Sequence, residues 1–186
     1  MNEELSTKMQ IVNKAVGLIK EHGFSNVSVN EICESVGITR SAFYYYFKTK
    51  DEVFDYYLLT PELYISEHIL PLLEASDYLS QFYMIFELFA KRIVEVGPEI
   101  VGLVFKRNID AKVRNLAPRD IAMWQVYVNL IKKAQENGEV RMSLHAESTV
   151  EAIIYLVNGI GVTWCNKKGN FDYTEECKRM IEFLLN

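Results

Sequence analysis

The chain contains few of the residues that build catalytic or metal centres. Its 186 residues include only three histidines and three cysteines. These six residues lie far apart, without the close spacing of metal ligands: they are His22, His68, His145, Cys33, Cys165 and Cys177. A glycine-rich phosphate-binding loop and a serine-nucleophile motif are also missing. We therefore expect a protein that is not an enzyme and that needs no metal or cofactor.

Signals for export, membrane insertion and β-structure are also missing. The acidic start MNEEL does not resemble a signal peptide, and an odd number of cysteines fits free thiols in a reducing cytoplasm. Residues 152–165 carry no charge, but they are too few to span a bilayer. No segment alternates as a strand, and no repeat or low-complexity run is visible. We expect an all-α, cytoplasmic, nucleoid-associated protein without a membrane partner.

Residues 27–53 predict two short helices joined at a glycine, followed by the start of a third helix. Ser28 and Glu31 form a capping box, so the first helix should begin at about Val29. Gly37 should end this helix, because glycine adopts the left-handed conformation without strain. Thr39 is a suitable N-cap for the second helix. This is the pattern of a helix-turn-helix.

The second helix of the motif is too short to be stable alone in water. Phe43 and Phe47 are spaced to face its interior side, which leaves Arg40 and Ser41 displayed on the polar side. A preceding helix is expected from Lys8 to His22, opened by Thr7. Together the three helices predict a small DNA-reading domain.

The N-terminal quarter of the chain combines the helix-turn-helix with a specific set of residues. These are Ile11, Ala15, Gly23, Ser28, Ile32, Gly37, Ile38, Phe43, Tyr44, Phe47, Lys50 and Asp51. In this arrangement the chain resembles the TetR family of bacterial transcriptional regulators. The resemblance implies a homodimeric, all-helical repressor. In this family a variable C-terminal domain binds a small molecule, and this binding spreads the two DNA-reading heads.

The charge distribution is compatible with this interpretation, although the chain has a net charge of -5. Residues 1–50 contain six basic and five acidic residues. Within residues 36–50 the charged side chains are Arg40, Lys48 and Lys50, without any acid. The expected reading surface is therefore locally positive, and the acidic remainder should discourage binding elsewhere.

Arg40 and Ser41 lie in the first turn of the expected recognition helix, so we expect them to read base edges in the major groove. The tyrosines that follow offer hydroxyls for phosphates and ring faces for a thymine methyl group. For Tyr44, Tyr45 and Lys50, DNA contact is what the family resemblance implies. For Ser28 two interpretations stay open, a phosphate contact or a helix cap alone. The full expected DNA-binding set is Ser28, Thr39, Arg40, Ser41, Tyr44, Tyr45, Tyr46 and Lys50.

The rest of the chain predicts a larger helical domain. We expect residues 1–49 to form the DNA-binding domain and residues 50–186 the effector-binding and dimerisation domain. Thr49 and Glu52 form a capping box that should start a helix ending at Tyr57 or Leu59. Further helices are expected near 61–75, 78–96, 98–109, 118–137, 146–166 and 173–185.

The last two of these helices are expected to pair with their symmetry mates in a four-helix bundle. In the final helix, the apolar stripe expected to form this interface comprises Tyr173, Cys177, Met180, Ile181 and Leu184. Gly159 and Gly161 would permit close approach of the helix before it. An ordinary intrachain core is the competing interpretation. A two-fold dimer predicts a palindromic operator in double-stranded DNA.

Aromatic residues at helical spacing in the middle of the chain predict a pocket for a small, largely apolar or aromatic effector. The expected set is Phe82, Phe86, Phe89, Phe105, Trp124, Tyr127 and Tyr155. The same spacing is also typical of an ordinary core. The alternative is therefore an architectural or partner-regulated DNA-binding protein without a small-molecule effector. A cavity beside Phe86 and Trp124 would favour the first interpretation.

Overall fold

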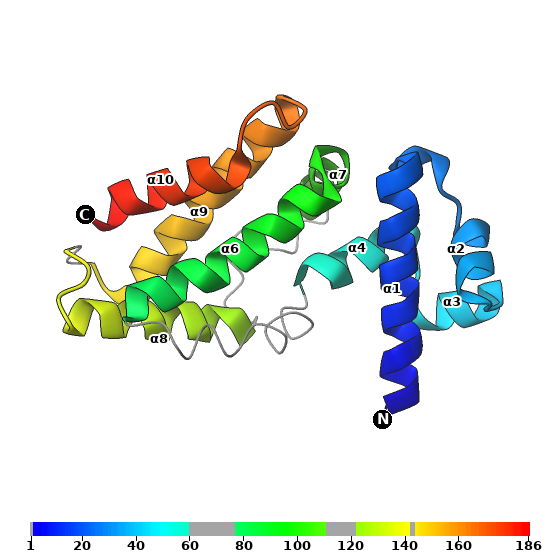
Figure 1. Cartoon of the computed structure of the whole chain (residues 1–186), viewed down its shortest axis with the longest axis horizontal. Coiled ribbons are helices and arrows are strands. Elements are labelled where there is room, and N and C mark those ends of the chain that lie inside the picture. The colour runs from blue at the N-terminus through cyan, green and yellow to red at the C-terminus, as the bar shows by residue number, and fades with distance from the viewer. Residues whose placement is uncertain (1, 60–76, 111–121, 142–143) are drawn as a thin grey trace.

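The structure is a computed structural model, and it describes residues 2–59, 77–110, 122–141 and 144–186. Within these ranges the protein is helical and has no strand, which confirms the all-α class (Figure 1). The helix expected at 61–75 lies outside the described residues. The helices and their bounds are α1 Asn2–His22, η1 Phe24–Asn26, α2 Val29–Val36, α3 Arg40–Tyr46, α4 Lys50–Leu59, α6 Tyr78–Val96, α7 Pro98–Asp110, α8 Ala122–Glu136, α9 Ala146–Asn166 and α10 Tyr173–Leu185.

Most predicted helix limits agree with the structure. Those of α6, α9 and α10 are as expected, and α4 begins after the Thr49 cap, where the Glu52 backbone N–H donates to Thr49 Oγ1 over 3.2 Å. The first helix is different, because α1 begins at Asn2 rather than near Lys8. The apolar stripe that begins at Ile11 marks only the buried part of this helix, so it does not show where the helix begins. The expected start of α8 at 118 lies outside the described residues.

The N-terminal helices form a compact head around a continuous apolar core. Ile11, Val12 and Ala15 of α1 are completely buried, and so are Ile32 of α2 and Phe43 of α3. Helix α4 packs on α1 and also reaches α6 and α7. It therefore joins the head to the larger domain (Figure 1).

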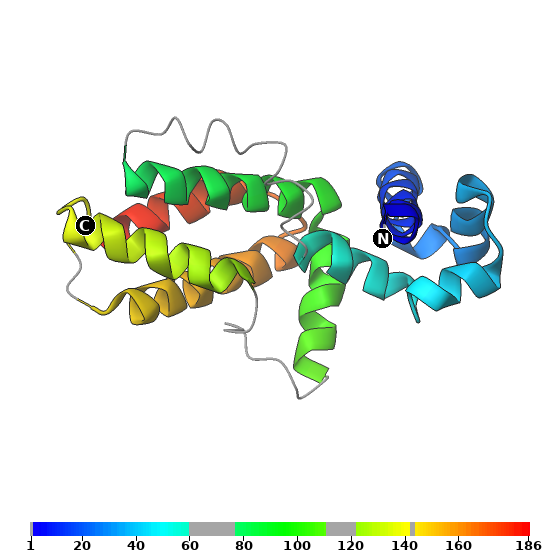
Figure 2. The ribbon, with the colours of Figure 1, turned by 90° about the horizontal axis from the view of Figure 1, so that it is seen from below.

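The larger domain is built from α6 to α10. Helices α6 and α8 pack against each other, as do α8 and α9, and α9 also contacts α7 and α10. In Figure 2, α7 runs across the direction of the other helices. The interior is closed by large side chains such as Phe82 and Trp124, which are 2% and 1% exposed. The Trp164 indole N–H donates to the Phe171 carbonyl over 3.1 Å and fixes the turn before α10.

The stripe expected at the α10 interface faces the interior of its own chain. Tyr173, Cys177 and Ile181 are buried, because α10 packs on both α6 and α9. Gly161 also faces inward, where an added Cβ would lie 3.0 Å from Phe105 Cζ, whereas Gly159 is exposed with open space beside it. The expectation that Tyr173, Cys177, Ile181 and Gly161 meet a partner is therefore wrong, whereas Met180 and Leu184 are half-buried. The sequence spacing identified an apolar face but not what covers it.

Candidate nucleic-acid interface

The recognition helix α3 is held on the head by its apolar side. Phe43 and Phe47 are buried, with ring centroids 6.0 Å apart. Thr39 caps the helix, since its Oγ1 accepts the Ala42 backbone N–H over 3.2 Å. Gly37 adopts the left-handed conformation at φ 77° and turns the chain between α2 and α3. These contacts confirm the predicted motif and give α3 a fixed orientation.

The preceding helix α2 begins at the predicted capping box. The Glu31 backbone N–H donates to Ser28 Oγ over 3.2 Å, and the Ser28 backbone N–H donates to Glu31 Oε2 over 2.7 Å. The Ser28 hydroxyl donates to the same carboxylate over 2.8 Å. The backbone hydrogen bond from Ser28, followed by its hydroxyl, lowers the pKa of Glu31. The only proton of the Ser28 hydroxyl is thus already used within the cap.

The opposite side of α3 presents polar and aromatic groups to solvent. Arg40 and Ser41 are exposed, and Tyr44 and Tyr45 are 45% and 72% exposed. Arg40 Nη2 lies 3.5 Å from the Tyr44 hydroxyl, and this hydrogen bond raises the pKa of Arg40. Tyr46 is only half-buried, and its ring meets Tyr45 edge-on at 5.0 Å. A row of donors and ring faces therefore lies on a rigid helix, as major-groove reading requires.

Lys50 lies apart from this row. Its ammonium donates to the carbonyls of Phe24 and Val27, over 2.5 and 2.7 Å, and sits 3.9 Å from the centroid of the Phe24 ring. Burial lowers the pKa of Lys50, while the nearby carboxylate of Asp51 acts in the opposite direction. The sequence could not indicate these contacts, because the two carbonyls lie 26 and 23 residues away along the chain.

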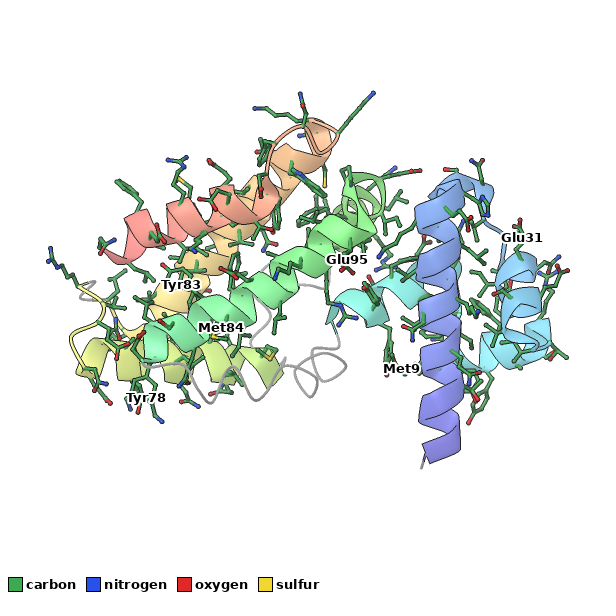
Figure 3. The ribbon with its side chains drawn as sticks, in the orientation of Figure 1. Met9, Glu31, Tyr78, Tyr83, Met84 and Glu95 are labelled. Atoms are coloured by element: carbon green, nitrogen blue, oxygen red, sulfur yellow. The ribbon has the colours of Figure 1, made fainter. Side chains whose placement is uncertain are left out.

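Polar contacts also connect the head to α6, and sequence reasoning missed them. Glu95 lies at the end of α6 that is nearer the head (Figure 3). It accepts a hydrogen bond from the Tyr57 hydroxyl over 3.0 Å and pairs with Lys20 of α1 at 3.5 Å. Burial raises the pKa of Tyr57, and the Arg92 guanidinium lies 3.9 Å above its ring. Since Glu95 touches both α1 and α4, it links the head to the larger domain at two points.

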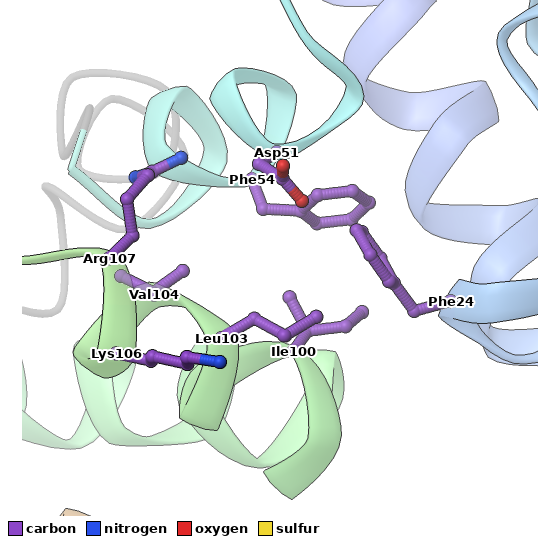
Figure 4. Close-up of a pocket in the computed structure, with 8 residues that line it drawn as sticks. All are labelled: Phe24, Asp51, Phe54, Ile100, Leu103, Val104, Lys106 and Arg107. Atoms are coloured by element: carbon purple, nitrogen blue, oxygen red, sulfur yellow. The ribbon is translucent and has the colours of Figure 1, made fainter. Parts of the chain in front are cut away.

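A second ion pair reinforces this link. Arg107 of α7 pairs with Asp55 of α4. Beside this pair is a cavity of about 190 Å³ between α4 and α7 (Figure 4). Its lining residues are Phe24, Asp51, Phe54, Ile100, Leu103, Val104, Lys106 and Arg107. The cavity lies at the boundary between the head and the larger domain, not beside Phe86 and Trp124.

The residues expected to bind an effector occupy two different environments. Six of them belong to one apolar core or pack against it: Phe82, Phe86, Phe89, Phe105, Trp124 and Tyr127. The rings of Phe82 and Tyr127 meet edge-on at 5.4 Å. Tyr155 is separate, because it is 46% exposed and its hydroxyl donates to Glu151 over 3.0 Å. The structure therefore does not bring Tyr155 into the same group.

Known proteins resemble the chain most clearly in the head. Residues 11–57 match the family model described as bacterial regulatory proteins, tetR family. The chain is 32% identical over 79 residues to the probable acrEF/envCD operon repressor of Escherichia coli (strain K12). That match covers 41% of this chain and 36% of the repressor, so this chain spans about a third of the length of that relative.

Solved structures extend the likeness to the whole fold. FadR of Thermus thermophilus, a TetR-family transcriptional repressor in complex with lauroyl-CoA, superposes with a TM-score of 0.70 at 19% identity, over 96% of this chain and 93% of FadR. FadR of Bacillus subtilis, in complex with stearoyl-CoA, gives 0.61 at 17% identity, over 96% and 97% of the two chains. At these identities the likeness establishes the fold alone. Residues 11–57 thus match the TetR-family model, and the whole chain has the fold of these TetR-family regulators.

Proposed function

We propose that the protein is a homodimeric transcriptional repressor that binds a palindromic operator and is released from it by a small, largely apolar or aromatic effector. The observation that carries the proposal is the exposed face of α3, held rigidly by Phe43 and Phe47. A short helix with buried anchors and a polar outer face is suited to insertion into the major groove. The proposed site of action is the nucleoid in the cytoplasm.

Within this interface Arg40 and Ser41 contact base edges, because they lie in the first turn of α3. Thr39, Tyr44, Tyr45 and Tyr46 contact phosphates or a thymine methyl group. For Ser28 the cap interpretation is favoured. A phosphate oxygen can only accept a hydrogen bond, and the Ser28 hydroxyl already donates its hydrogen bond to Glu31.

Arg40→Ala tests the assignment of the reading face. The variant should lose preference at one base pair of each half-site, by roughly 1–3 kcal/mol. The matched control is Arg141→Ala, because Arg141 is exposed on the other domain after α8. Fluorescence anisotropy on duplexes altered at single positions measures the base preference of each variant. Unchanged base preference in Arg40→Ala would remove Arg40 from the interface.

The proposed dimer surface is the outer face of α9 together with the adjoining face of α10. On α9 this face comprises the uncharged residues Ala152, Tyr155, Leu156, Gly159, Val162 and Thr163, and Glu151 borders it through its hydrogen bond with Tyr155. Phe183 of α10 is 80% exposed. Exposed uncharged side chains on two packed helices are suited to an isologous contact with a second copy of the chain, and the Glu176–Arg179 ion pair lies on the same side of α10 as Phe183. The helix pair is the one expected from the sequence, but it is the outer face that is available.

The effector proposal rests on the half-buried aromatic residues of three helices. Phe89 of α6, Phe105 of α7 and Tyr127 of α8 pack against the core without being fully covered by it. The two FadR structures of similar fold contain acyl-CoA molecules, so an acyl-CoA is a reasonable first probe. An effector acts by binding one conformation more tightly, which shifts the population of DNA-competent heads.

Release from DNA tests the effector proposal. The purified protein is bound to labelled DNA flanking its own gene, and lauroyl-CoA, free CoA and a small-molecule extract of the host cell are added separately. The proposal expects an apolar compound to lower the anisotropy, and free CoA serves as the control without an acyl chain. Specific binding that every addition leaves unchanged would favour the architectural or partner-regulated alternative.

A further inference from the structure

A lysine at the start of α4 makes hydrogen bonds to the backbone of the same chain. Lys50 is the first residue of α4, and its ammonium bonds the carbonyls of Phe24 and Val27. These two carbonyls belong to the first residue of η1 and to the residue that follows η1, which is the single turn between α1 and α2. The side chain therefore ties the first turn of α4 to the segment that leads into the helix-turn-helix.

The surroundings of the ammonium favour this arrangement. Ammonium groups have three donors and are costly to bury without acceptors, and here two carbonyls and the face of the Phe24 ring receive them. Carboxylates from three elements add a favourable field, namely Asp51 of α4, Glu31 of α2 and Glu99 of α7. Glu99 also accepts a hydrogen bond from the hydroxyl of Ser25, which belongs to η1, over 3.2 Å.

A phosphate contact would disrupt this arrangement. To reach DNA the ammonium would have to leave both carbonyls, and the loss of donors to partly buried carbonyls is costly. The Phe24 carbonyl would keep the long hydrogen bond from the Val27 backbone N–H, at 3.4 Å. Arg40 and Lys48 are the exposed cations between residues 36 and 50, so they can supply positive charge to DNA without such a loss.

The contact also sits where the head meets α7. Phe24, which lies under the Lys50 ammonium, meets Phe54 edge-on at 5.7 Å and lines the cavity beside α7 (Figure 4). On the other side of Lys50, Val27 precedes the Ser28 cap of α2. A single lysine thus lies between the boundary with the larger domain and the start of the DNA-reading motif.

We propose that Lys50 is a positioning residue, which sets the orientation of α2 and α3 by holding the α1–α2 turn against α4, and not a phosphate ligand. This inference rests on the proposed DNA-binding function. It implies that the first turn of α4 moves as part of the reading head. Bending that follows effector binding must then occur after Lys50 along α4.

The test compares Lys50→Met with Lys48→Met, which removes an exposed charge two residues earlier. Each protein is measured on a duplex that the wild type selects from a random pool, and on an unrelated duplex, over a range of salt concentrations. Lys50→Met should bind the selected duplex about tenfold more weakly, as for one charge-assisted hydrogen bond. Its salt slope and its affinity for the unrelated duplex should stay as in the wild type. Loss of a phosphate contact would instead reduce the slope by about 0.9 and weaken binding to both duplexes.

Two further readouts separate positioning from general instability. Binding is measured well below the thermal midpoint of each variant, and hydrogen exchange of the free proteins is compared. In Lys50→Met the amides of residues 24–31 should exchange faster, whereas in Lys48→Met they should not. Lys50→Arg should not restore affinity, because a planar guanidinium does not match a compact site for an ammonium, although it binds phosphates well.

The outcomes distinguish the inference from the proposed function. A reduced salt slope in Lys50→Met, or full affinity in Lys50→Arg, would overturn the positioning role and assign Lys50 to the phosphate backbone. Unchanged exchange at residues 24–31 would by itself overturn the positioning role. Failure of the wild type to select any duplex would refute the proposed function itself.

Discussion

Replacing Val162 by glutamate should separate the two protomers of the proposed dimer. Val162 lies on the uncharged outer face of α9 and is 41% exposed in one chain. Covering that fraction of a valine is worth about 0.6–1.2 kcal/mol, so two symmetry-related copies contribute roughly 1–2.5 kcal/mol. A glutamate there must also lose its hydration, which costs several kcal/mol for each unpaired ion. A total loss of at least about 4 kcal/mol would raise the dimer dissociation constant about 1,000-fold.

Sedimentation velocity over a range of protein concentrations measures this constant directly. The matched control is Val94→Glu, because Val94 is 44% exposed on α6 and lies outside the proposed surface. Circular dichroism should show the same helix content for both variants and the wild type. A Val162→Glu protein that dimerises as tightly as the wild type would refute the α9 surface. Dissociation of both variants alike would show that an added charge disturbs the chain without regard to position.

Other perturbations test the head and its link to the larger domain. Ser28→Ala should lower the free energy of unfolding by about 1 kcal/mol through loss of the α2 cap, and urea unfolding measures this loss. If the variant instead lost much more binding free energy for DNA than unfolding free energy, the phosphate interpretation of Ser28 would be restored. Hydrogen bonds keep the pKa of Glu31 below its ordinary value, so its contribution is present above that value and is lost as the pH falls through the lowered one. The stability difference between the wild type and Glu31→Gln should therefore shrink below pH 4.5, and a constant difference would exclude the carboxylate as its source. Tyr57→Phe removes the hydroxyl that donates to Glu95 and should cost about 0.5–1.5 kcal/mol in thermal unfolding, whereas an unchanged midpoint would show that this contact contributes nothing.

Local chemistry made the helix-turn-helix predictable from sequence. The caps formed by Ser28, Gly37 and Thr39 use hydrogen bonds to residues only three or four positions away in the sequence. Each residue therefore takes the role that its position indicates. The helical spacing of Phe43 and Phe47 likewise settles which side of α3 is buried, because no distant partner changes the direction of these side chains.

Contacts between distant segments were not predictable. The side chain of Lys50 finds acceptors 26 and 23 residues away, and a sequence pattern does not show how α1 and α4 approach each other. The stripe of Cys177 and Ile181 has the same spacing whether α6 or a second chain covers it. Tyr155 was similarly assigned to a pocket, because its aromatic character does not reveal that it faces outward.

Duplex selection from a random pool tests whether α3 of a dimer reads a specific palindrome. We expect an enriched inverted repeat, bound by two protomers at least about 1,000 times more tightly than random duplex. We also expect Arg40→Ala to lose preference at one position of each half-site. A pool without an enriched sequence, or an enriched sequence that Arg40→Ala binds with unchanged preference, would refute reading of a palindrome by α3.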